Sequence, residues 1–176
     1  MAQAGDGQMC DAVIDRGTLL AIMQAAKKAD DSLLRDYAET TVAVADIKIA
    51  VRSMKTGKNK DFMKRAMAEC NTLDIDRLAT AAVAGMEEIE RYLADTAYAG
   101  GAEALSESAS SFERWCDNRI IETIKPQKYN PFTVGPIVAY ILARLNEIKT
   151  VRIILTCKLN QLPEEAIRER VREMYV

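Results

Sequence analysis

The sequence of 176 residues contains no histidine. Histidine is the side chain most often used for acid–base catalysis near neutral pH, and it is the commonest metal ligand. Its absence excludes a Ser–His–Asp or Cys–His nucleophile, an H-E-x-x-H zinc site and a Glu-x-x-His di-metal bundle. We therefore predict no catalytic, cofactor-binding or metal-ligating residue. An enzyme that uses carboxylates alone is the weakest of the functions considered below.

The chain also lacks a long apolar run and a strong net charge. Its longest stretch without a charged residue, 129–143, contains Pro131 and Pro136 and is shorter than the ~20 apolar residues that span a bilayer. The first eight residues have neither the basic segment nor the apolar segment of a secretory signal. A net charge of −2 gives no overall attraction to nucleic acid or anionic lipid. These absences predict a soluble protein with no nucleic-acid partner.

Carboxylates gather at three places, where they suggest either a catalytic pair or a helix start. The groups are Asp74 with Asp76, Glu87 with Glu88 and Glu90, and Glu164 with Glu165. Each group stands where a helical pattern begins, and negative charge is stabilised at a helix N-terminus. We therefore interpret all three as helix-capping groups.

Apolar residues recur at helical spacing along nearly the whole chain, and no segment shows the alternation of a strand. This pattern predicts an all-α fold. The expected helices cover about 15–29, 32–56, 61–70, 73–84, 87–96, 103–125, 136–158 and 163–175. The sequence Ala99-Gly100-Gly101 is expected to break the helical pattern, because glycine stabilises a helix poorly. It divides the chain into a first helical module, 11–99, and a second, 102–176.

The helix expected at 136–158 is apolar on nearly every side, which predicts that it is buried on every side. Arg152 continues its apolar stripe of Leu145, Ile148 and Leu155. Two interpretations of Arg152 remain open. Either its guanidinium has an acidic or carbonyl partner, or it buries only its stem and keeps its charge in water.

Two segments about a hundred residues apart resemble each other. Residues 46–52 read DIKIAVR and residues 147–152 read EIKTVR. Both lie late in a long predicted helix that is followed by a shorter one. The shared position favours two related helical modules, and chance similarity between two amphipathic helices is the alternative.

Residues 140–155 (YILARLNEIKTVRIIL) and 158–170 (KLNQLPEEAIRER) resemble the C-terminal signature of the C subunit of the archaeal and bacterial A/V-type ATP synthases, the equivalent of the d subunit of the V-ATPase. Weaker similarity covers 13–16, the helix that ends at Arg52, and 92–98. Members of that family are longer and contain three similar helical modules around a pseudo-threefold axis. The resemblance implies that this chain corresponds to the middle and C-terminal modules, an incomplete three-module funnel.

The resemblance also implies a function. The family's members are non-catalytic rotor-coupling subunits of a proton- or sodium-translocating rotary ATP synthase or ATPase. They link the central stalk to the membrane proteolipid ring and so lie at the cytoplasmic face of the membrane. The expected partners are the central-stalk subunits and the ring, with membrane contact only through them. A free-standing helical adaptor or scaffold is the alternative function.

Two sets of candidate site residues follow. Lys48, Arg52 and Lys55 form a basic stripe, which predicts an interface with acidic groups of the stalk. Glu147 and Arg152 are the candidate structural ion pair within the second module. Since an absent module uncovers apolar surface on its neighbours, we also expect the chain to self-associate.

Overall fold

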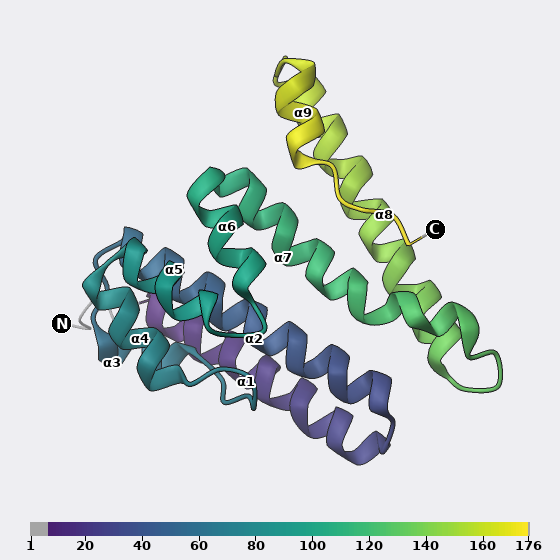
Figure 1. The fold of residues 1–176 in the computed structure, drawn as a ribbon, viewed down its shortest axis with the longest axis horizontal. Coiled ribbons are helices and arrows are strands. Elements are labelled where there is room, and N and C mark those ends of the chain that lie inside the picture. The colour runs from purple at the N-terminus through teal and green to yellow at the C-terminus, as the bar shows by residue number, and fades with distance from the viewer. Residues whose placement is uncertain (1–6, 176) are drawn as a thin grey trace. The chain divides into compact units, whose positions relative to one another are not determined.

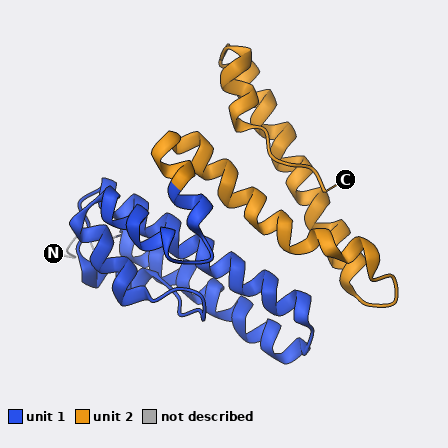
Figure 2. Ribbon diagram, in the orientation of Figure 1, with its two compact units in different colours: residues 1–102 blue, residues 103–176 orange. Residues whose placement is uncertain are grey.

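The computed structural model describes residues 7–175, which form nine α-helices and one 3₁₀ helix and contain no strand (Figure 1). This result confirms the predicted all-α fold. The chain divides into two compact units, residues 1–102 and residues 103–176 (Figure 2). Each unit is described by itself below.

Unit 1 is built on a pair of long helices. Helix α1 (Gly7–Ala29) packs along α2 (Ser32–Lys55), and the short α3 (Lys60–Ala66) packs on both. Helix α4 (Ile75–Ala84) covers α2 and α3, and α5 (Met86–Ala94) returns beside α4 and α2. Helices α2 to α5 provide the fully buried Val42, Ile47, Met63, Leu78, Ile89 and Leu93 of the core, and Met67 and Tyr98 add to it from the segments after α3 and α5.

Unit 2 has a similar long pair. Helix α7 (Ala109–Ile124) is followed by the 3₁₀ helix η1 (Lys125–Tyr129) and by α8 (Gly135–Leu159), which packs against α7. The short α9 (Glu164–Arg170) packs on both α7 and α8. The buried core of this unit includes Phe112, Cys116, Ile121, Ile124 and Ala139.

Side-chain caps fix where several helices begin. The Asp74 carboxylate accepts the Arg77 N–H at 3.0 Å, and the Ser108 hydroxyl accepts the Ser111 N–H at 2.9 Å. Asp76, Glu87 with Glu88, and Glu164 with Glu165 lie in the first turns of α4, α5 and α9. The interpretation as a helix cap is thus confirmed for Asp74, whose carboxylate satisfies an N–H that has no partner within the helix. Helices α5 and α9 begin without a side-chain cap, so their first-turn glutamates are favoured only by the helix dipole, and Glu90 lies beyond the first turn of α5.

The predicted helix break at Gly100 and Gly101 is wrong. Both glycines lie inside helix α6 (Ala99–Glu107), which crosses the boundary between the two units. A helical glycine costs only about 1 kcal/mol relative to alanine, and the alanines at 99, 102 and 104 favour the helix. The break comes instead at Ser108, the N-cap of α7.

The last helix is also shorter than predicted, because it ends at Arg170. Residues 171–175 are extended and run back along the unit. Their backbone is held by α7 and α8: the Asn118 side-chain oxygen accepts the Glu173 N–H at 2.9 Å, and the Asn146 amide donates to the Glu173 carbonyl at 2.8 Å. These contacts replace the hydrogen bonds that a continued helix would make.

The same three-part arrangement occurs in both units. A long helix (α2 or α8) is followed by a seven-residue helix (α3 or α9) and then by an extended segment that returns to the long helix. In unit 1, the Asp46 carboxylate on α2 accepts the Ala68 N–H at 3.0 Å. In unit 2, Asn146 on α8 has this role toward Glu173. The two similar sequence segments, 46–52 and 147–152, therefore begin at or beside the residue that holds the returning segment.

Gly85 and Gly17 provide a matched test of the backbone geometry. Gly85 joins α4 to α5 at φ +138°, ψ −179°, while Gly17 lies inside α1, and a Cβ at either position would meet nothing within 4 Å. Because only the backbone differs, Gly85→Ala should lower the free energy of unfolding by ~1–3 kcal/mol. Gly17→Ala should raise it by ~0.5–1 kcal/mol. Urea denaturation of both variants checks the signs, and effects of the same sign would contradict the structure.

Candidate interaction surfaces

The predicted basic stripe lies on the last turns of α2. Lys48, Arg52 and Lys55 are spaced by four and three residues and so share one face of the helix. Arg52 and Lys55 are exposed, and Lys48 is half-buried. Positive charge is favourable there, because the C-terminus of a helix is the negative end of its dipole. The stripe is a surface feature of unit 1, and its contact with a stalk stays a prediction.

The structure does not bring Glu147 and Arg152 together. Five residues on a helix turn the side chains about 140° apart. The Glu147 carboxylate accepts a hydrogen bond from Arg144 instead, and Arg152 is exposed. Of the two interpretations left open for Arg152, the structure shows the one in which the guanidinium faces water.

The buried arginine of unit 2 is Arg172, which sequence reasoning missed. Its Nε donates to Asp117 Oδ2 at 2.7 Å, and Lys149 Nζ donates to Asp117 Oδ1 at 2.6 Å. Arg172 and Asp117 are only 7% and 8% exposed. The partners are 55 positions apart, so no local pattern reveals the pair. The available signal was a carboxylate at 117 on the face of α7 that also carries the buried Ile121 and Ile124.

Helix α8 has two opposite apolar faces, and only one of them is buried. The inner face consists of small side chains, Ala139, Ala143, Asn146, Thr150 and Cys157, all buried. The outer face carries large apolar side chains that are 46–84% exposed: Ile137, Ile141, Leu145, Ile148, Leu155 and Leu159. The prediction that this helix is buried on every side is therefore wrong for the chain alone. Its apolar residues mark an outward surface as well as a core.

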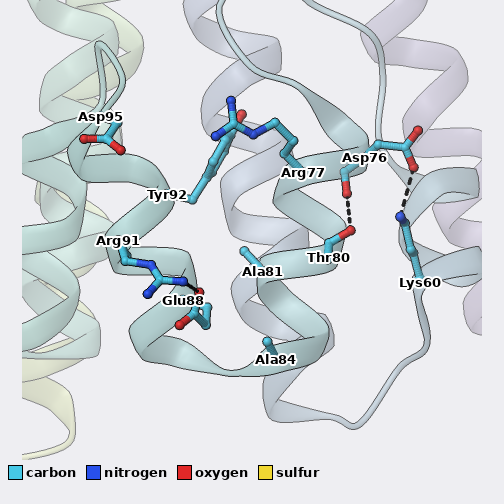
Figure 3. Close-up of a pocket in the computed structure, with 10 residues that line it drawn as sticks. All are labelled: Lys60, Asp76, Arg77, Thr80, Ala81, Ala84, Glu88, Arg91, Tyr92 and Asp95. Carbon is cyan, nitrogen blue, oxygen red and sulfur yellow. Dashed lines mark hydrogen bonds and ion pairs between the residues drawn. The ribbon is translucent and has the colours of Figure 1, made fainter.

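A hollow of about 420 Å³ lies between α4 and α5 (Figure 3). Four of its six charged side chains form two ion pairs. Lys60 contacts Asp76 at 3.2 Å, Arg91 pairs with Glu88, and the Arg77 guanidinium lies over the Tyr92 ring at 5.4 Å. Because only Arg77 and Asp95 lie outside these two ion pairs, the hollow offers a ligand little unpaired charge. We assign no chemistry to it. Across residues 7–175, no three His, Cys, Asp or Glu side chains are grouped as metal ligands would be.

The comparison with known families is decisive. The sequence model of the ATP synthase (C/AC39) subunit matches residues 1–170. The chain belongs to this family. The C subunit of the A-type ATP synthase of Methanocaldococcus jannaschii is 26% identical over 156 residues, which cover 84% of this chain and 39% of that protein. The chain thus spans less than half the length of this relative. No solved structure matches it.

In this member of the C/AC39 family, Asp46 is a strongly perturbed acid. Its side chain is fully buried, and of its two oxygens only Oδ1 accepts a hydrogen bond within the described part of the chain. Burial raises the pKa of Asp46 to about 7, against the opposing effects of the Ala68 N–H and the positive charge of Arg16. Burial also raises the pKa of the nearby Cys70 thiol, to about 11.

Asp46 should make the stability of unit 1 depend on pH. Between pH ~4 and ~7 the folded protein binds a proton at Asp46 that the unfolded chain does not, so stability should rise as pH falls through this window. The shift from 3.8 to about 7 corresponds to at most ~4 kcal/mol. Urea denaturation followed by circular dichroism at pH 8 and pH 5 measures the difference in the free energy of unfolding. The variant Asp46→Asn should remove most of this difference.

Asp76→Asn is the control for this experiment. Asp76 is exposed, and the adjacent Lys64 and Lys60 lower its pKa, so its contribution is lost only in more acidic solution. The control variant should keep the slope between pH 5 and pH 8. Trp115, the single tryptophan, reports on unit 2 within the same sample. An unchanged slope in Asp46→Asn would contradict the assignment.

Arg172 and Arg152 form a matched pair of arginines in unit 2. Arg172→Ala removes the cation from a buried carboxylate and should lower the free energy of unfolding by ~3–5 kcal/mol. Arg152→Ala removes an exposed side chain and should cost no more than ~0.5 kcal/mol. Thermal melts of the two variants test this order. Equal losses of stability in the two variants would contradict a stabilising role for the buried Arg172–Asp117 ion pair.

Proposed function

We propose that the chain is a non-catalytic rotor-coupling subunit of an A/V-type rotary ATP synthase or ATPase that moves protons or sodium ions. In this role it links the central stalk to the proteolipid ring of the membrane. The observation that carries the proposal is the match to the ATP synthase (C/AC39) subunit across residues 1–170. The relative's name, which makes it the C subunit of an A-type ATP synthase, points to the same assembly.

Two surfaces support a coupling role. The basic stripe on α2 offers positive charge, and the outer face of α8 offers apolar area. Large exposed apolar patches are typical of protein interaction sites. Because α8 exposes its large side chains in the chain alone, the isolated protein should also tend to self-associate.

Membrane contact is proposed to come through the partner subunits at the cytoplasmic face. In the described range, every helix is too short or too polar to serve as a bilayer span. We further propose that residues 11–99 and 102–176 correspond to the family's middle and C-terminal modules. The repeated three-part arrangement of the two units supports this correspondence.

Purification of the native assembly tests the proposed function. The tagged chain is expressed in its source cells and recovered from detergent-solubilised membranes. Stalk and ring subunits should co-purify in constant ratio with it, and mass spectrometry identifies them. A chain that purifies without rotary subunits would overturn the proposal and favour the free-standing adaptor.

Charge reversal of the basic stripe should weaken the contact with the stalk. The variant Lys48→Glu, Arg52→Glu, Lys55→Glu should bind the purified stalk roughly tenfold more weakly at low salt, because three surface ion pairs together contribute ~1–2 kcal/mol. The difference should shrink as salt rises. The matched control is Lys27→Glu, Lys28→Glu at the exposed end of α1. If the control weakens binding as much, the stripe is not the stalk interface.

A further inference from the structure

We infer that the outer face of α8 is a docking site for one amphipathic helix of a partner protein, and that this helix carries a carboxylate opposite Arg152. The inference goes beyond the proposed function, because it names the site and the chemistry of its occupant. It holds whichever protein supplies the helix.

The spacing of the outer face fits a partner helix. We call its central row the α8 seam, which consists of Ile141, Leu145, Ile148, Arg152, Leu155 and Leu159. The intervals are four, three, four, three and four residues. This is the spacing of the two core positions of a coiled coil, where each side chain inserts between side chains of a facing helix. The 25-residue length of α8 provides about three heptads of contact.

The α8 seam is not needed to build unit 2. The side of α8 opposite the seam carries the small buried residues, such as Ala139, Ala143 and Thr150, that face α7 and α9. Small side chains allow those helices to approach closely, which completes the inner contact. The apolar seam, with Ile141, Leu145 and Leu155 more than half exposed, is thus available as a second packing surface.

Arg152 specifies the charge of the occupant. It is the only charged residue of the α8 seam, and a helix laid on the seam would remove its guanidinium from water. The only carboxylate on α8 is Glu147, which pairs with Arg144 off the seam. An unpaired buried charge is strongly unfavourable, so the facing helix must provide an aspartate or glutamate. A polar group at one core position also fixes the register of the pair.

A second copy of α8 does not meet this requirement. Parallel pairing in register would place Arg152 against Arg152. Antiparallel pairing with Leu145 opposite Ile148 would place Arg152 against Ile141. Neither arrangement gives the guanidinium a carboxylate. Any self-association through the α8 seam should therefore be weaker than binding of a helix that supplies a carboxylate, and such a helix is the specific occupant.

Two synthetic peptides test the inference with the full chain. Both are helices of about four heptads with leucine at the 3–4 positions, and they differ only in one core residue, which is glutamate in one and lysine in the other. Fluorescence anisotropy gives their dissociation constants. The glutamate peptide should bind the wild type at least about tenfold more tightly than the lysine peptide. The variant Arg152→Glu should reverse this preference.

Two apolar variants locate the site. Ile148→Ser in the α8 seam should weaken the binding of both peptides, while Val83→Ser, at a comparably exposed position on α4, should leave the binding of both unchanged.

Three results with the peptides would overturn the inference: binding of neither peptide, an equal loss of affinity in both apolar variants, or a preference that Arg152→Glu does not change. A discrete dimer that persists in the presence of saturating glutamate peptide, measured by sedimentation velocity, would also overturn it and identify a second copy as the occupant. Co-purification with rotary subunits is a separate measurement, so the two proposals fail independently.

Discussion

The rest of this fold depends on one constraint. In each helical unit, the backbone N–H and C=O groups of an extended segment need hydrogen-bond partners among the helices. Each unit solves it with a polar side chain placed near the middle of its long helix, Asp46 in unit 1 and Asn146 in unit 2. The preceding helix adds a second contact. Arg16 Nε donates to the Met67 carbonyl at 2.7 Å, and Asn118 accepts the Glu173 N–H. Since a buried backbone group without a partner is costly, these few polar residues determine where the short helix ends and how the chain returns.

The two units solve the same constraint with different electrostatics. Asp46 is a buried carboxylate whose hydrogen-bond partner is a backbone N–H, so burial dominates its pKa. Asp117 is also buried, but Arg172 and Lys149 both contact it. The first arrangement favours a neutral acid, while the second places two cations against the carboxylate. A shared arrangement of helices is therefore compatible with two kinds of polar core.

The helices and their caps were largely predictable, because both depend on residues close together in the chain. The apolar spacing of α2 and α8 and the carboxylates at the start of α4 and α9 are local signals. The ties to the returning segments were not predictable, since Asp46 and Ala68 are 22 positions apart and Asp117 and Arg172 are 55 apart. The breadth of the apolar surface of α8 was visible in the sequence. Periodicity alone does not show whether a second apolar face of a helix is buried or faces outward. The sequence therefore predicts burial of α8 on every side and leaves two interpretations of Arg152 open.

The extended segment 171–175 gives the last residues of this sequence a structural role. Arg172 and Glu173 contact α7 and α8 through both side chain and backbone. These residues thus act as a latch across a helical hairpin. Loss of only five residues would remove the cation that Arg172 provides to Asp117 and the backbone partners of Asn118 and Asn146. For work with this protein, the end that carries the latch is the wrong place for truncation, and a fusion or tag there needs a flexible spacer.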